Sequence, residues 1–304
     1  MSDTVKRTLV ALAIGALGLA HTGCSIKKMA INTLGKAMAE GSSGFGKDDD
    51  PELVRDAVPF ALKTIESLIE ASPKNKDLLQ AACSGFTQYA YAFIQQEADF
   101  IEAQDLGRAT AMRQRAKKLY LRARDYGMRA LEVDVPGFGD RLRRNTDAVL
   151  AKLTKKHVAL LYYTGASWAA AFAVDVTDSS LSVEQTLFEK MLRRALALDE
   201  TYELGSLHEF FISWEAGHST AGGSMASARE HFERAKRLAD GKRVSLFVSL
   251  AESVSVSEQK KDEFEKLLNE ALAVDITKAP DQKLANIIAQ RRAKWLLSRI
   301  DELF

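Results

Sequence analysis

Apolar positions recur at helical spacing along most of the chain. Four segments, 75–96, 156–174, 202–216 and 282–303, carry apolar side chains every three or four residues, the period of one helix face. Their stripes are Leu78, Leu79, Ala82, Phe86, Tyr89, Ala90, Phe93 and Ile94; Val158, Leu161, Tyr162, Gly165, Ala169 and Phe172; Leu204, Leu207, Phe211 and Trp214; and Leu284, Ile287, Ile288, Leu296 and Ile300. The pattern predicts an all-α protein that ends in a C-terminal capping helix.

Local signals fix one helix start and resolve one ambiguous segment. Asp50 can cap a helix whose first position is Pro51, and Glu52 complements the positive end of the helix dipole. Residues 244–256 alternate in a strand-like way. A lone strand would have no partner here, so we predict a helix for this segment.

An internal repeat is visible in several segments, each of which is expected to form the second helix of a helical hairpin. Similar phrases end three helices: RALEVD (129–134), RALALD (194–199) and EALAVD (270–275). A fourth copy runs from Ala228 to Ala235, which lies 40 residues after Ala195, and Gly165 and Gly205 are also 40 residues apart. Small residues at such positions allow close helix contact. The spacing predicts an irregular, tetratricopeptide-like solenoid of helical hairpins, with an ordinary all-α bundle as the alternative.

The N-terminus has the features of an export signal. Lys6 and Arg7 precede an apolar run over 8–20, which suits a signal peptide better than a membrane span. Small residues then lead to Cys24, as in a bacterial lipoprotein signal, although His21 departs from the usual aliphatic residue. An ordinary secretory peptide or an uncleaved anchor is the alternative.

This pattern divides the chain into three parts. We expect a signal peptide at 1–23, a lipid anchor and flexible spacer at 24–47, and a single α-helical domain at 48–304. Acyl chains on Cys24 would hold the protein at the membrane. Ser25 follows that cysteine, where many inner-membrane lipoproteins carry Asp, so we expect the periplasmic face of the outer membrane.

Composition and motifs exclude several kinds of function. Lys and Arg number 42 against 41 Asp and Glu, so a neutral chain has little general attraction for nucleic acid. Two cysteines and five histidines show no metal-ligand spacing, and we expect neither a metal nor a cofactor. Cys83 borders an apolar stripe and is expected in the core. No nucleophile elbow, phosphate loop or metalloprotease motif occurs, so we expect no enzyme.

The faces opposite the apolar stripes offer candidate binding residues. Exterior helix faces usually carry Lys and Glu, whereas these carry amide, hydroxyl and aromatic side chains, which suit a ligand or partner on a concave face. The candidates are Ser84, Gln88, Tyr91, Gln95, Tyr163, Thr164, Ser167, Trp168 and Glu209. Burial against a neighbouring helix is the alternative.

Longer blocks of sequence carry a family resemblance. The blocks SGFTQYAYAFIQQEAD (84–99), YYTGASWAAA (162–171) and LHEFFISWE (207–215), behind a cysteine that SIKKMAIN follows, resemble the TatT family. These are the T components associated with tripartite ATP-independent periplasmic (TRAP) transporters. The resemblance implies a lipid-anchored periplasmic homotrimer with a pore. It also implies a partnership with the transporter's substrate-binding component and passage of a small organic acid or hydrophobic ligand.

Two functions of different kinds remain open at this point. The first is an accessory of a TRAP-type uptake system that binds the substrate-binding component. The alternative is a tetratricopeptide-like lipoprotein scaffold for envelope assembly that has no small-molecule ligand.

Overall fold

The protein is helical throughout the part of the chain that the computed structural model describes, which is Thr33, residues 44–218 and residues 223–304. The helices are α2 (Pro51–Ala71), α3 (Lys76–Tyr89), α4 (Gln96–Ile101), α5 (Leu106–Asp134), α6 (Phe138–Arg144), α7 (Thr146–Leu150), α8 (Val158–Val174), α9 (Ser179–Ser182), α10 (Gln185–Leu198), α11 (Ser206–Gly217), α12 (Met225–Ala239), α13 (Ser245–Leu250), α14 (Lys261–Ala273), α15 (Lys283–Ser298) and α16 (Ile300–Leu303). Two π-helical segments, η1 (Ala90–Gln95) and η5 (Ala251–Ser255), and several 3₁₀ turns join them. These residues contain no strand, which confirms the all-α prediction.

The export and anchoring predictions fall outside this part. The predicted signal peptide, Cys24 and most of the segment at 24–47 lie among residues that the structure does not describe. No helix within the described ranges is long and apolar enough to cross a membrane.

Local signals placed several helix ends correctly. Asp50 Oδ1 accepts hydrogen bonds from the backbone N–H groups of Glu52 and Leu53, at 3.1 and 3.0 Å, so the predicted cap is confirmed. The segment with strand-like alternation is helical, in α13 and η5, as predicted. The repeat phrases end α5, α10 and α14.

Three predicted helices differ in extent. The helix expected over 75–96 continues through η1 into α4. The segment 202–216 is broken at Gly205, whose φ of 88° is a left-handed conformation that a continuous helix cannot contain. The C-terminal segment forms α15 and then α16, because the backbone leaves helical geometry at Arg299.

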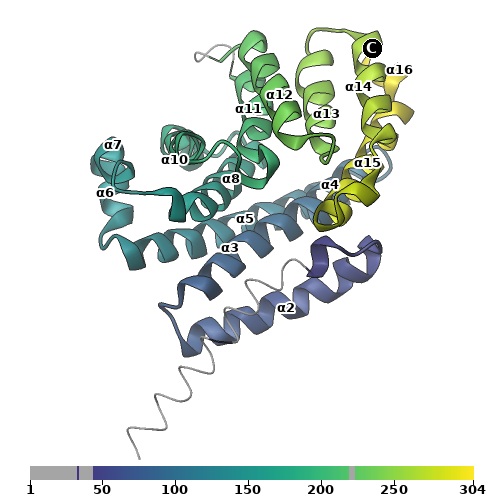
Figure 1. Cartoon of the computed structure of the whole chain (residues 1–304). Coiled ribbons are helices and arrows are strands. Elements are labelled where there is room, and N and C mark those ends of the chain that lie inside the picture. Colours follow the sequence, from purple (N-terminus) through teal and green to yellow (C-terminus); the bar gives the residue numbers. More distant parts are fainter. Residues whose placement is uncertain (1–32, 34–43, 219–222) are drawn as a thin grey trace, which may run out of the picture.

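The longer helices pair in the order that the repeat predicts. α3 packs on α5, α8 on α10, α11 on α12, and α13 on α14, and α15 follows against α14 (Figure 1). A Cβ on Gly165 would lie 2.6 Å from Leu192 Cγ, which explains the need for glycine where α8 meets α10. The central alanines of the repeat, Ala130, Ala195 and Ala271, are fully buried.

Side-chain contacts between successive pairs occur at regular sequence separations. Second helices interact 34 residues apart, as in the ion pair of Arg229 with Glu263. First helices interact 40 residues apart, as in the hydrogen bond from Ser253 to Ser213, at 2.8 Å. Each separation recurs because successive helical pairs stack in a similar way, with one spacing between neighbouring second helices and another between neighbouring first helices.

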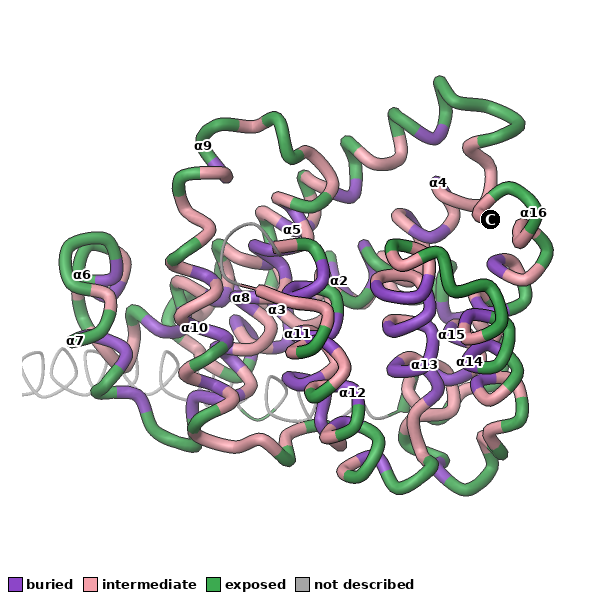
Figure 2. Tube along the Cα trace, turned by 90° about the horizontal axis from the view of Figure 1, so that it is seen from above, coloured by how far each residue is buried: buried purple, intermediate pink, exposed green. Residues whose placement is uncertain are grey.

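The apolar interior divides into two clusters that meet at α11. Leu207, Phe211 and Trp214 belong to a cluster that extends back to α2, whereas Ile212 and Ala216 belong to a cluster that extends forward to α15. Figure 2 shows buried positions along the facing sides of these helices. α11 is therefore the element that both clusters share.

The two ends of the helical series contact each other. The ring of Phe100, in α4, lies 5.2 Å from that of Trp295 on α15. Arg291 donates to Glu97 and Glu52, both at 3.3 Å. The contact brings residues 190 to 240 positions apart together and closes the series on itself.

Candidate functional site

Five polar side chains form a continuous line across the helices that come first in each pair. This polar belt consists of Ser213 on α11, Ser253 and Glu252 on η5, Arg292 on α15, and Asp99 on α4. Arg292 donates to both oxygens of Glu252, at 2.6 and 2.7 Å, and to Asp99 at 3.1 Å. Together with the hydrogen bond from Ser253 to Ser213, these contacts link four elements, including both ends of the helical series.

Tyr91 is the most exposed aromatic residue beside the belt. Its side chain projects from the π-helical segment η1, and 47% of its surface is exposed. Desolvation nevertheless raises the pKa of its hydroxyl, and Glu252, Glu209 and Asp99 raise it further while Arg292 opposes them. The hydroxyl thus stays protonated and can donate a hydrogen bond at neutral pH. π-Helical turns frequently mark functional sites, and both such segments here contribute to this region.

A second polar contact extends the belt along α11. Arg243 donates to Glu209 from Nε at 3.1 Å and from Nη2 at 2.6 Å, and its Nη1 donates to the carbonyl oxygen of Glu203 at 2.9 Å. The rings of Tyr162 and Tyr163 lie 5.0 Å apart, close enough to Arg243 for its charge to act on both hydroxyls. The charges of this region are paired, and tyrosine hydroxyls supply its uncharged donors.

Six of the nine predicted binding residues keep exposed surface. Gln88 is exposed, and its side-chain amide donates to the carbonyl oxygen of Ser84. Gln95 is partly buried and accepts a hydrogen bond from Tyr120 at 2.6 Å. The remaining partly exposed candidates are Ser84, Tyr91, Tyr163 and Glu209. Contact of these six residues with a ligand or partner stays a prediction.

Thr164, Ser167 and Trp168 lie inside the helix packing, which corrects their assignment to a ligand-facing surface. Thr164 and Ser167 have no exposed surface, and Trp168 exposes 1%. The hydroxyl of Ser167 donates to the carbonyl oxygen of Thr164, and the guanidinium of Arg124 lies 5.1 Å from the centre of the Trp168 ring. For these three residues of α8, burial against neighbouring helices, the alternative given above, therefore holds.

Cys83 is a core residue, as predicted. Its side chain is fully buried, and desolvation raises the pKa of its thiol to about 12. The thiolate that nucleophilic chemistry needs is therefore strongly disfavoured.

The sequence did not point to the histidine pair at the contact of α11 with α12. His208 Nδ1 and His231 Nδ1 lie 2.8 Å apart, so one donates a hydrogen bond to the other. His208 Nε2 lies 3.3 Å from Glu200. The described residues contain no group of three or more side chains arranged to bind a metal ion. The two histidines come from different helices, and only the fold brings them together.

Two contacts of the polar belt could have been predicted from the 40-residue spacing of the repeat. Glu252 and Arg292, like Ser213 and Ser253, are 40 residues apart, the same separation that relates Gly165 to Gly205. No comparable signal identifies Asp99, because it contacts Arg292 through the closure of the two ends.

The described structure is that of an all-α protein built from helical hairpins, with a polar surface across the first helices. Its sequence matches the family model described as TRAP transporter T-component over residues 47–304, so the chain belongs to that family. It is also 29% identical over 303 residues to a protein of Treponema pallidum (strain Nichols) that is named only as uncharacterized, and the match covers 93% of each chain. Family membership supports an accessory role in TRAP transport.

Proposed function

We propose that the protein is a periplasmic, lipid-anchored accessory of a TRAP-type uptake system that binds the transporter's substrate-binding component. The observation that carries the proposal is the family match over residues 47–304. Tyr91 beside the polar belt, and the exposed Gln88 three residues before it, provide hydrogen-bonding and aromatic surface without a strong net charge. Such a surface suits a protein partner or a small organic ligand better than a polyanion.

The test is native mass spectrometry of the purified protein with and without the substrate-binding component. A complex of defined mass supports the accessory role, and a small molecule retained in it supports ligand passage. A scaffold for envelope assembly predicts neither species. No complex at micromolar concentrations of both proteins contradicts the proposal.

Variants locate the interaction on the surface. Tyr91→Ala and Gln88→Ala are expected to weaken the complex, because they remove the exposed Tyr91 side chain beside the belt and the exposed Gln88 side chain three residues before it. Val183→Ala is the control, because Val183 is 80% exposed and lies after α9, outside the belt. Equal affinity of all three variants contradicts the placement of the interface.

Membrane attachment and oligomeric state belong to the same proposal and have their own tests. Cys24→Ser, or treatment with globomycin, should leave the protein at precursor size if Cys24 is lipidated, and fractionation should lose it from the outer membrane. The homotrimer implied by the resemblance predicts a trimeric mass by light scattering. A monomer at micromolar concentration contradicts it.

A further inference from the structure

The connection from α5 to α8 departs from the turn that follows the similar phrases at the ends of α10 and α14. After α10, Asp199 Oδ1 accepts from the N–H and the hydroxyl of Thr201, at 3.2 and 2.6 Å. After α14, Asp275 makes the same two contacts with Thr277, at 3.0 and 2.6 Å. In both copies the carboxylate at the end of the phrase closes its own turn.

Asp134 occupies the same place in the first copy but cannot make this turn. The residue two positions later is Pro136, which has neither an N–H nor a hydroxyl. The chain instead forms the extra helices α6 and α7 before it reaches α8. The carboxylate of Asp134 is therefore directed to side chains from elsewhere.

Those side chains are basic. Lys76 Nζ lies 2.5 Å from Asp134 Oδ2 and Lys156 Nζ lies 3.6 Å from it. His157 Nδ1 accepts from the backbone N–H of Thr154 at 3.0 Å, so in the neutral imidazole Nε2 carries the proton and donates to Asp134 at 3.1 Å. Burial raises the pKa of Asp134, but these neighbours outweigh burial and hold that pKa below its usual value. Asp134 is thus ionised, and these basic neighbours already balance its negative charge.

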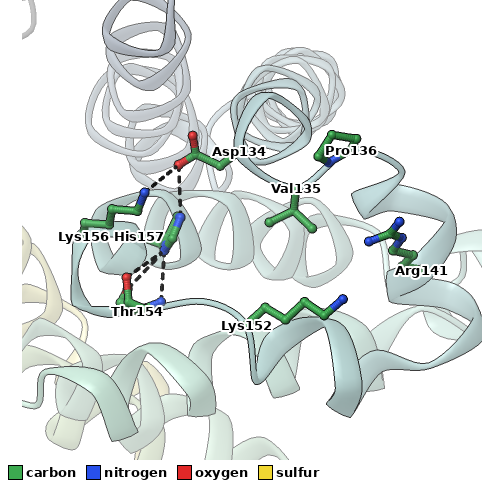
Figure 3. Close-up of a pocket in the computed structure, with 8 residues that line it drawn as sticks. All are labelled: Asp134, Val135, Pro136, Arg141, Lys152, Thr154, Lys156 and His157. Atoms are coloured by element: carbon green, nitrogen blue, oxygen red, sulfur yellow. Dashed lines mark hydrogen bonds and ion pairs between the residues drawn. The ribbon is translucent and has the colours of Figure 1, made fainter.

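A cavity of about 440 Å³ opens beside this group. Its lining residues are Asp134, Val135, Pro136, Arg141, Lys152, Thr154, Lys156 and His157. Figure 3 shows Arg141 and Lys152 on the side of the cavity away from His157, with Val135 and Pro136 forming an apolar wall nearby. Among the described residues, neither Arg141 nor Lys152 has an ion-pair or hydrogen-bond partner for its charged group.

The charge of the lining defines what the cavity can hold. Three cationic side chains face one carboxylate, which leaves a formal charge of +2 with His157 neutral. Guanidinium binds carboxylate through two parallel hydrogen bonds, and the ammonium groups add point charges. The apolar wall at Val135 and Pro136 suits a short hydrocarbon chain more than it suits a bare inorganic ion.

We propose that this cavity binds a small organic anion whose carboxylate pairs with Arg141 and Lys152 and whose hydrocarbon part lies on Val135 and Pro136. The site is separate from the polar belt. From Lys76, at the cavity end of α3, to Tyr91 the chain advances 15 residues, about 22 Å along the helix axis. The proposal therefore does not depend on where the transporter's partner binds.

Isothermal titration of the full chain with succinate, butyrate and inorganic phosphate tests the proposal. The expected result is one site for succinate and butyrate, with phosphate weaker. In Arg141→Ala/Lys152→Ala the affinity for succinate should fall about tenfold or more, as expected for loss of charge-assisted hydrogen bonds.

A charge-matched variant controls for general electrostatics. Arg144→Ala/Lys155→Ala likewise removes one arginine and one lysine, each three residues after its counterpart, and both side chains are more than two-thirds exposed and outside the cavity lining. Its affinity should change by less than about twofold, because exposed charges at a distance are screened. Absence of carboxylate binding, equal losses in the two variants, or tighter binding of phosphate than of succinate overturns the proposal. Unchanged thermal unfolding of both variants shows that neither loss is due to misfolding.

Discussion

Asp99 and Arg292 are 193 residues apart in the sequence and form an ion pair of 3.1 Å that joins the first and last parts of the helical series. Their side chains are only 17% and 13% exposed. Asp99 also accepts from Arg113 on α5, at 2.8 Å, and Arg292 also binds Glu252. The closure of the series therefore depends on a buried charge network, beside the aromatic contact of Phe100 with Trp295.

Arg292→Ala is expected to destabilise the protein by about 3 kcal/mol, because it leaves the largely buried Glu252 without its ion-pair partner and leaves Asp99 with Arg113 alone. The neighbouring Arg291→Ala is the matched control. Arg291 is 50% exposed, so its loss should cost less than about 1 kcal/mol. Denaturant unfolding measures both values. Equal costs would show that the Arg292 network does not hold the two ends together.

Gly127 is expected to tolerate no larger residue. A Cβ there would lie 2.0 Å from Thr164 Oγ1 and 2.9 Å from Cys83 Sγ, so Gly127→Ala forces α5 and α8 apart, at a cost of about 1–3 kcal/mol.

Two further variants test this explanation. Gly107→Ala, in the same helix, meets no atom closer than 3.6 Å and should leave the thermal midpoint unchanged or slightly raised. The double variant Gly127→Ala/Thr164→Ala removes the closest clash and should recover part of the loss. Additive losses in the double variant would contradict a steric origin.

His231 is expected to make the protein less stable below about pH 6.5. Burial, together with the neighbouring His208, lowers its pKa to about 4, whereas an unfolded histidine titrates near 6.5. Between these values the unfolded chain binds a proton that the folded chain does not, so this stability is present above about pH 6.5 and is lost as the pH falls towards 4.

Thermal midpoints measured from pH 7 to pH 4 test this dependence. His231→Asn should show a smaller decrease than the native chain, because the titrating group is gone. His218→Asn is the control for removing a histidine at the end of α11. Identical profiles for the native chain and His231→Asn would rule out this histidine as the cause.

The sequence was informative where the cause is local or periodic, and silent where the cause is a distant contact. Asp50 caps α2 because the donors are two and three residues away, and Glu252 meets Arg292 because the repeat places first helices 40 residues apart. Thr164 looked accessible because periodicity identifies one packed face, but it does not show whether other helices cover the second. The pairing of Asp99 with Arg292 depends on how the whole series curves, which no local pattern contains.

The thiol of Cys83 is expected to be unreactive in the folded protein. Burial excludes reagents from the fully buried side chain and raises its pKa to about 12, so very little thiolate exists at pH 8.

Thiol labelling tests this expectation in Cys24→Ser, in which Cys83 is the only cysteine. A chromogenic disulfide such as Ellman's reagent should then label no thiol in the native state and one thiol per chain in guanidinium chloride. Because labelling requires α3 to separate from α5 and α8, the native rate should rise in Gly127→Ala, in which the added methyl crowds Cys83. Complete labelling of the native protein within seconds would contradict the burial of this residue.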